Sequence, residues 1–288
     1  MQVTRDSLKY NFLRRIIIRI DYSGIVDIKS GLNEIHNNFI NYGFVKMREE
    51  FIQEAEFKLD DPIMIDGQGS IPIKEIQKTE TFKYASADED LILEINRFFT
   101  TLSINAIKYR DFNEYIDIFS NVVSLIKSKN TFMNPLRLGV RKINDCILLN
   151  KNKFDYFFNE RYFRDIAKDL SEDGIDVKKL NTSIVDNIYK DDISYNYIRN
   201  CTEGTLSNGE QTIEGYQVVV DIDGYTQNND RLNNIISNKL CIDNFLSEIN
   251  ENLFNLYKFT LSNQFIELLQ TESTDFEDKE ILGVEKND

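Results

Sequence analysis

Apolar residues alternate with polar ones near the start of the chain and then change to a helical spacing. Residues 12–24 place four apolar side chains on one side of an extended segment, which predicts a strand. Four more between 28 and 42 recur three or four positions apart, which predicts a helix that ends at Gly43. The two sets are Ile16, Ile18, Ile20 and Tyr22 for the strand, and Ile28, Leu32, Ile35 and Phe39 for the helix.

Three segments that follow are rich in β-branched and aromatic residues. They cover 44–59, 73–84 and 91–109, and Gly-, Pro- and Asp-containing turn signals separate them. This composition predicts three antiparallel strands. Residues 112–128 return to helical spacing, with one apolar face, and predict a second amphipathic helix.

The second half of the chain resembles the first in outline. We expect a long strand over 134–150, a short helix or edge segment at 154–163, and strands near 177–200 and 213–223. The longest helical pattern then runs over 230–270 without a proline. This order, with tight turns between strands, predicts an α+β fold with antiparallel sheet and helices packed on one face.

The domain organisation follows from these patterns. Residues 1–270 are predicted to form a single α+β body, and the repeated outline leaves open a division into two lobes, 1–130 and 131–270. Residues 271–288 are acidic and aperiodic. They are therefore predicted to form a disordered, solvated tail.

Composition then narrows the function classes. The 288 residues include 48 Asp and Glu against 34 Lys and Arg, which gives a net charge of −14. Such a balance disfavours nucleic-acid binding, because phosphate contacts require a basic surface. No apolar run is long enough to span a membrane, and no signal peptide is recognisable. The three widely spaced cysteines, Cys146, Cys201 and Cys241, favour a reducing cytoplasm over a disulfide framework.

Common catalytic residue sets are missing from the sequence. His36 is the single histidine, so it is the one candidate for every mechanism that needs an imidazole. It lies in the first predicted helix beside Ile35, and we expect it to be an ordinary boundary residue of that amphipathic helix. No phosphate-binding glycine loop occurs. The sequence therefore predicts no cofactor and assigns no catalytic residue.

Two groups of residues could hold a metal ion. Asp221 and Asp223 lie on one face at the end of a predicted strand, a spacing that suits Mg²⁺ or Ca²⁺. Asp21, Glu56 and Lys58 imitate the Asp…Glu-x-Lys set of metal-dependent nucleases. The competing interpretation is that these acids face solvent, since a chain with 48 acids produces such spacings by chance.

The alternation of apolar residues breaks within 136–145. Apolar side chains occupy even positions up to 140, but the next one is Ile143, at an odd position. One explanation is a bulge that turns Arg141 inward, where it would need a carboxylate partner, with Asp21 as the first choice. Loss of that pair would cost about 3–5 kcal/mol. The alternative is that Arg137 and Arg141 both face water.

The same segment carries a family resemblance. Residues 136–144, LRLGVRKIN, resemble the Arg-Ile-Gly-Leu-Arg-Tyr-Ile-Asn signature of a sporadically distributed, functionally uncharacterised prokaryotic family. The block 82–103 and Tyr109 agree in order, and the resemblance extends over 80–270. It departs at Lys142, where the family usually has an aromatic residue. The matching signature positions are Arg137, Gly139, Arg141 and Asn144. The resemblance implies a role in phage defence or a toxin–antitoxin system and supplies no catalytic residues.

These observations favour a non-catalytic protein-binding component of a bacterial defence or toxin–antitoxin system, such as an adaptor, an inhibitor or an antitoxin-like chaperone. Edge strands expected around 154–200 could pair with another protein, and self-association stays open. A metal-dependent nuclease is the alternative, and an acidic inhibitor that mimics DNA is a second one. Binding of Mg²⁺ or Mn²⁺ would separate the nuclease from the adaptor.

Overall fold

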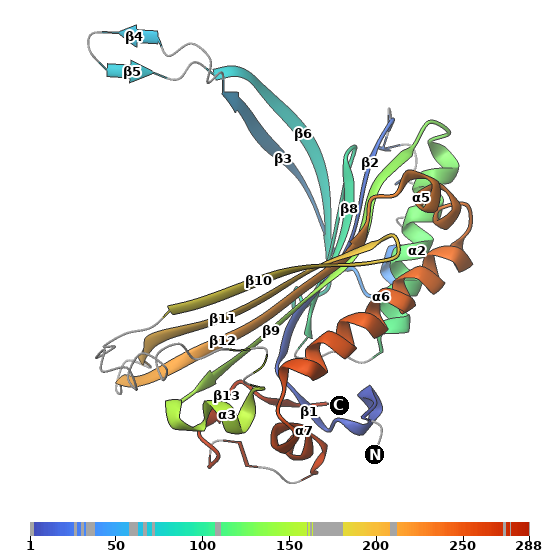
Figure 1. Cartoon of the computed structure of the whole chain (residues 1–288). Helices are drawn as coiled ribbons and strands as arrows, with labels where there is room; N and C mark the ends of the chain where they lie inside the picture. Colours follow the sequence, from blue (N-terminus) through green and yellow to red (C-terminus); the bar gives the residue numbers. More distant parts are fainter. Residues whose placement is uncertain are drawn as a thin grey trace.

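A large antiparallel sheet forms the centre of the computed structural model (Figure 1). The structure describes residues 3–25, 28–29, 32, 38–57, 63–65, 68–70, 73–106, 111–159, 161, 163, 181–207, 212–272, 275–276 and 278–287. Within these residues, ten strands form one sheet in the order β10-β11-β12-β9-β2-β8-β7-β6-β3, with β13 beside β9. The predicted α+β class with antiparallel sheet is confirmed.

The strands of this sheet come from both halves of the chain. The first half supplies β2 (Leu13–Ser23), β3 (Lys46–Phe57), β6 (Ile73–Ala85), β7 (Leu91–Asn96) and β8 (Phe99–Asn105). The second supplies β9 (Asn134–Leu148), β10 (Asn181–Lys190), β11 (Ile193–Ser207), β12 (Thr212–Thr226) and β13 (Ile281–Leu282). Two short pairs lie outside it, β1 (Tyr10–Asn11) with β14 (Glu285–Lys286), and β4 (Ile63–Ile65) with β5 (Gln68–Ser70).

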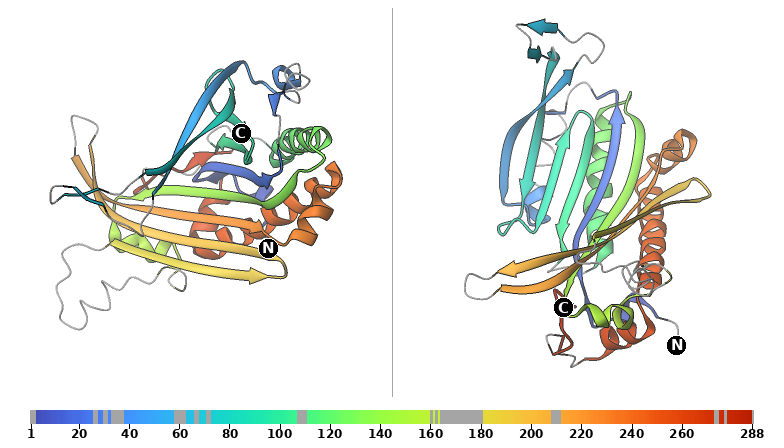
Figure 2. Two further views of the ribbon diagram at one scale, coloured as in Figure 1. Left: turned by 90° about the horizontal axis from the view of Figure 1, so that it is seen from above. Right: turned by 60° about the vertical axis from the view of Figure 1, so that its left-hand side comes forward.

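The two halves share one topology. Apart from β13, the first strand of each half pairs with the last, β2 with β8 and β9 with β12, and the remaining strands follow outward. The first strands, β2 and β9, pair with each other at the centre and join the halves into one sheet. The sheet is strongly twisted, as β-sheets of proteins generally are. The strands at its two ends, β10 to β12 on one side and β3 with β6 on the other, therefore extend in different directions (Figure 2).

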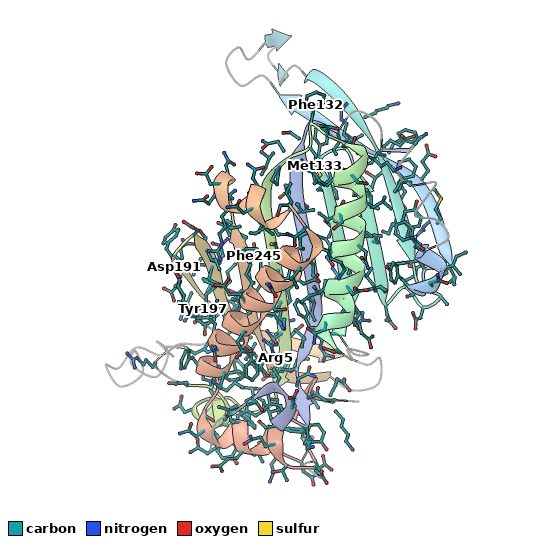
Figure 3. All side chains as sticks on the ribbon, turned by 90° about the vertical axis from the view of Figure 1, so that its right-hand side faces the viewer. Arg5, Phe132, Met133, Asp191, Tyr197 and Phe245 are labelled. Carbon is teal, nitrogen blue, oxygen red and sulfur yellow. The ribbon has the colours of Figure 1, made fainter. Side chains whose placement is uncertain are left out.

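Helices cover one face of the sheet. α2 (Phe112–Lys129) follows β8, and α6 (Lys239–Thr260) follows β12 after the short α5 (Asn229–Ile235). Figure 3 views this face and shows α2 and α6 side by side over the strands. Their apolar stripes and the facing side chains of the sheet form the hydrophobic core. We call the opposite side of the sheet the outer face.

The helix predicted over 230–270 is divided into three. Asn238 begins α6, and its side chain accepts a hydrogen bond from the Cys241 amide. Ser262 in the same way begins α7 (Asn263–Gln270) through the Phe265 amide. Both capping residues have extended backbone, so each ends the helical path although the apolar spacing continues. The longest helix of this region, α6, spans 22 residues.

Two segments that were predicted as single strands contain hairpins. The segment 91–109 holds β7 and β8, and the Asn96 side chain accepts from the Phe98 and Phe99 amides at their turn. The segment 177–200 holds β10 and the start of β11, joined at Asp191, whose positive φ of 53° suits a tight turn. The short helix predicted within 154–163 is α3 (Phe154–Phe157), which follows the 3-10 turn η3 (Lys151–Lys153).

The prediction of a disordered tail over 271–288 is wrong for the described residues of this segment. β13 pairs with β9, and β14 pairs with β1 near the other end of the chain. Ile281 and Phe276 are buried in the core. A single apolar residue every few positions gives no periodic signal, so this docking was not visible in the sequence.

Parts of the N-terminal prediction lie outside the described residues. Of the helix expected over 28–42, the structure describes helical residues at 29, 32 and 38–41, and buries Leu32 and Phe39. His36, Lys58 and Tyr109 are not among the described residues.

Candidate functional site

Strand β9 explains the break in the apolar pattern. Its even-numbered residues from Leu138 to Leu148 are buried toward the helices, and its pairing with β12 runs without a shift. The bulge predicted near Arg141 is therefore wrong. The pairing of β9 with β2 shifts register twice, between Leu13 and Arg15 and again between Asp21 and Tyr22, where Leu136 is the extra residue on β9. Neither shift lies at Arg141. Two polar residues of β9, Lys142 and Asn144, occupy core-facing positions, and this is why the apolar alternation fails.

Arg141 lies on the outer face, against the expectation that it turns inward. Its Nε donates to a carboxylate oxygen of Asp221 at 2.8 Å, and an Nη donates to the other oxygen. The Arg141 side chain is 44% exposed and that of Asp221 11%. The acid chosen from the sequence, Asp21, instead accepts from Arg19 at 2.7 Å. Arg141 does have a carboxylate partner, but the pair forms at the rim of solvent.

The other two signature residues that face outward, Arg137 and Gly139, lie beside Tyr225. Arg137 donates to Asp223 at 2.7 Å, and its guanidinium lies 4.3 Å from the centre of the Tyr225 ring. A Cβ at Gly139 would lie 2.5 Å from the carbonyl oxygen of Gly224 and 2.6 Å from the Cβ of Tyr225. Glycine at 139 thus allows β9 and β12 to approach closely at this point. Burial raises the pKa of Asp223, against the effect of Arg137.

Of the two predicted metal sites, the pair Asp221 and Asp223 lies together on one face of β12, whereas Asp21 and Glu56 lie on distant strands. Asp221 and Asp223 are each bonded to an arginine, and β9 separates them from Asp21 on β2. Glu56 lies on β3, four strands from β2, which is about 19 Å across the sheet. The nuclease set of Asp21, Glu56 and Lys58 is therefore wrong for its two described members. Among the described residues, no group of three or more His, Cys, Asp or Glu side chains could hold a metal ion.

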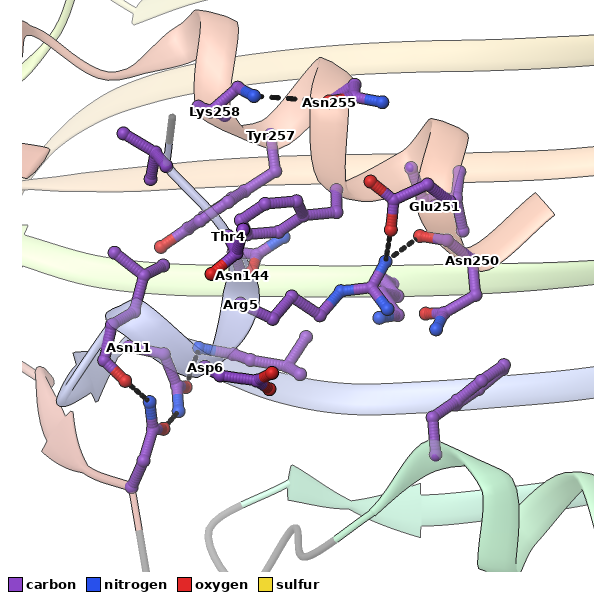
Figure 4. Close-up of a pocket in the computed structure, with 18 of the residues that line it drawn as sticks. Thr4, Arg5, Asp6, Asn11, Asn144, Asn250, Glu251, Asn255, Tyr257 and Lys258 are labelled. Atoms are coloured by element: carbon purple, nitrogen blue, oxygen red, sulfur yellow. Dashed lines mark hydrogen bonds and ion pairs between the residues drawn. The ribbon is translucent and has the colours of Figure 1, made fainter. Parts of the chain in front are cut away.

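A cavity of about 790 Å³ lies on the helix side of β9. It is lined by Lys142 and Asn144 of the sheet, by residues of α6 and by Phe112 at the start of α2. Figure 4 shows Asn144 together with the lining residues of α6. The N-terminal segment, which contains the 3-10 turn η1 (Arg5–Ser7), lines the remaining side. Its volume is in the range of pockets that hold small molecules.

Four polar side chains in the lining are each less than a tenth exposed. Lys142 and Asn144 come from β9, and Asn250 and Tyr257 come from α6. Asn144 donates its Nδ2 to the carbonyl oxygen of Val220 at 3.0 Å. Within the described residues, the Oδ1 of Asn250 and the hydroxyl of Tyr257 have no hydrogen-bond partner. Such groups are costly to bury, so they mark a place where a ligand or water would be stabilised.

Lys142 is the buried cation of the cavity. Burial lowers the pKa of its ammonium well below the usual range, Arg5 lowers it further, and Glu251 acts in the opposite direction. Its Nζ lies 5.1 Å from the centre of the Phe112 ring. A negative charge placed beside such a lysine raises its pKa, and the amine then takes up a proton.

Arg5 fixes the N-terminal segment to α6. Its Nη donates to the carbonyl oxygen of Asn250 and lies 3.6 Å from the carboxylate of Glu251. Its guanidinium also lies 5.0 Å from the centre of the Phe254 ring. These contacts close one side of the cavity over its buried polar groups (Figure 4).

The outer edges of the sheet are a second candidate surface. Within the described residues, β10 pairs with β11 alone and β3 pairs with β6 alone. Tyr189 and Val185 of β10 are strongly exposed, as are Phe51 and Met47 of β3. The sequence anticipated an edge strand in the region of β10. It missed the cavity, although the polar residues at 142 and 144 were a signal for it.

Comparison with known proteins adds no family. No family model, no curated protein and no solved structure matches this chain. Among the described residues, no helix is long and apolar enough to cross a membrane.

Proposed function

We propose that this chain is a non-catalytic protein-binding component, acting as an adaptor, inhibitor or antitoxin-like chaperone, and that its partner adds a strand to β10. The observation that carries the proposal is the ten-residue strand β10, which pairs on one side only among the described residues and has exposed apolar side chains. Edge strands of this length are templates for pairing with another chain, and partners that bind in this way use main-chain hydrogen bonds.

The hairpin geometry defines which backbone groups of β10 face outward. Lys190 and Ile193 flank a two-residue turn, so they form a hydrogen-bonded pair. Alternation then directs the N–H and C=O groups of Ser183, Val185, Asn187 and Tyr189 away from β11. These are the groups that a partner strand would meet.

The opposite edge, β3, is less suited to this role. Six of its twelve residues are charged, whereas β10 has two charged residues in ten. One of these two, Asp186, is bonded to Arg199 on the adjacent strand β11. Charged residues on an edge strand oppose pairing with another chain. A setting in phage defence or a toxin–antitoxin system is supported by the resemblance of residues 136–144.

The test compares two substitutions at one position. Asn187→Pro removes an outward N–H and leaves the pairing with β11 intact, while Asn187→Ala keeps the N–H and serves as the control. We expect affinity purification from the native host to recover one partner with the wild-type chain and with Asn187→Ala, and to lose it with Asn187→Pro. Equal recovery by both variants, or no recovered protein with the wild-type chain, would contradict the proposal.

A further inference from the structure

The cavity beside β9 is separate from the edge strand and has the features of a ligand site. Its lining buries four polar side chains from two elements, and two of these carry an atom with no partner in the described part of the chain. The hydroxyl of Tyr257 can donate or accept a hydrogen bond, and the Oδ1 of Asn250 can only accept one. A core that served stability alone would place apolar residues at these positions.

We infer that this cavity binds a small organic acid, whose carboxylate is held by the Lys142 ammonium and whose apolar part lies among the aromatic side chains of the lining. The inference concerns a site independent of the proposed protein-binding edge. It rests on the charge, the burial and the chemistry of the residues that line the cavity.

The charge of the lining favours an anion. Four lining residues are basic and three are acidic, whereas acids exceed bases by 14 in the whole chain. The basic ones are Arg5, Lys9, Lys142 and Lys258, and the acidic ones are Asp6, Asp111 and Glu251. Lys142 is the one lining cation that is less than a tenth exposed. A ligand with a single negative charge, such as a carboxylate, requires less compensation in this buried place than a phosphate dianion does.

The remaining lining selects the body of the ligand. The lining includes two aromatic side chains, Phe112 of α2 and Phe254 of α6. Leu253 and Ile222 add aliphatic surface. An apolar or aromatic body would be buried there. The free acceptor on Asn250 would be satisfied by a ligand O–H or N–H. A hydroxyaryl acid has all three groups: a carboxylate for Lys142, an apolar ring for the aromatic lining and an O–H for Asn250.

Binding of a carboxylate should be linked to a proton. Because burial lowers the Lys142 pKa, its amine is more readily neutral in the empty cavity than a lysine in water. A carboxylate beside it raises that pKa, so the complex takes up a proton and affinity falls as pH rises. Arg5 from η1 opposes this protonation, and Glu251 from α6 favours it. The other ionisable groups of the lining are Tyr257 and Lys258 of α6, Asp111 before α2, and Asp6 and Lys9 of the N-terminal segment.

Calorimetry with defined probes tests the inference. The probes are 4-hydroxyphenylacetate, phenylacetate and hexanoate, with neutral 4-hydroxyphenylacetamide and inorganic phosphate as comparisons. Titrations in two buffers of different ionisation enthalpy report proton uptake. We expect 4-hydroxyphenylacetate to bind more tightly than its amide, with uptake of protons and with affinity that decreases as pH rises.

Two variants and a control locate the binding. Lys142→Met should weaken 4-hydroxyphenylacetate by about tenfold or more and abolish proton uptake, because a charge-assisted hydrogen bond is lost. Tyr257→Phe should weaken it less, and Arg137→Ala, on the outer face, should leave it unchanged. Binding of none of the three carboxylates, equal binding of acid and amide, or unchanged binding and proton uptake in Lys142→Met would overturn the inference. Tighter binding of phosphate would assign the cavity to phosphate compounds and also overturn it.

Discussion

The two faces of β9 both carry polar residues, which are partly exposed to solvent on one face and buried on the other. On the outer face, Arg137 and Arg141 bond to aspartates of β12 at the rim of solvent. On the core-facing side, Lys142 and Asn144 are buried beside a cavity. Ordinary strands leave the buried side apolar, so polar residues there require a reason beyond solubility. The comparison shows that a broken alternation can mark a site rather than a bulge.

The largest effect on this comparison should come from Gly139, where the outer face is most crowded. We expect Gly139→Ala to lower the free energy of unfolding by about 3 kcal/mol, because the new Cβ meets backbone and Tyr225. Gly204→Ala on β11 is the control, since its Cβ would meet no heavy atom within 4 Å. Urea unfolding of both variants measures the difference, and equal stabilities would show that β9 and β12 are not held this closely.

Lys142 should limit stability on the core-facing side. Its pKa is lower in the folded chain than in the unfolded one, so the unfolded state binds more protons between the two values. Wild-type stability should therefore rise with pH through that window. Lys142→Met should remove this slope and raise stability at neutral pH by about 1–3 kcal/mol. Thermal melts across pH measure both, and a less stable variant would mean that the amine contributes net stability.

Asn144 should contribute stability on the same side as Lys142. Asn144→Ala removes the hydrogen bond to the Val220 carbonyl and should cost about 1–2 kcal/mol. Chemical denaturation measures this loss. Asn200→Ala, on an outward position of β11 opposite Val219, is the comparison and should cost less. A larger loss at Asn200 than at Asn144 would argue against a structural role for the buried amide.

The smallest effects should come from the two arginines of the outer face. Arg141→Ala leaves the largely buried Asp221 carboxylate without its guanidinium, and should cost about 1 kcal/mol, since solvent at Arg141 weakens the pair. Arg137→Ala should cost a similar amount, because Asp223 is more exposed than Asp221 while Arg137 itself is less exposed than Arg141. Melts of the two variants decide this, and a loss of about 3–5 kcal/mol at Arg141 would restore the view of a buried pair.

Periodic segments were predicted well because their signals are local. Strand β2 and helix α2 follow from alternation and helical spacing over many residues. The helix over 230–270 was misjudged because the caps at Asn238 and Ser262 act through one hydrogen bond each and leave the apolar spacing unbroken. Local caps are weaker signals than a long stripe of apolar residues.

The partner of Arg141 shows what local patterns omit. The sequence indicated that this arginine needs a carboxylate, but both Asp21 and Asp221 were available in the chain. The pairing of β9 with β12 selected Asp221, and the pairing of β9 with β2 left Asp21 to Arg19. Register between strands distant in sequence depends on the whole sheet and has no local signature.

The sequence by itself determined the α+β class, the antiparallel strands and the main apolar faces, because backbone periodicity and burial act over a few residues. The tertiary structure decided the order of strands, the docking of the C-terminal segment and the cavity around Lys142. That cavity brings together η1, α2, β9 and α6, whose residues lie more than a hundred positions apart from first to last. Long-range packing creates such a site, because only the assembled sheet and helices bring these side chains to one place.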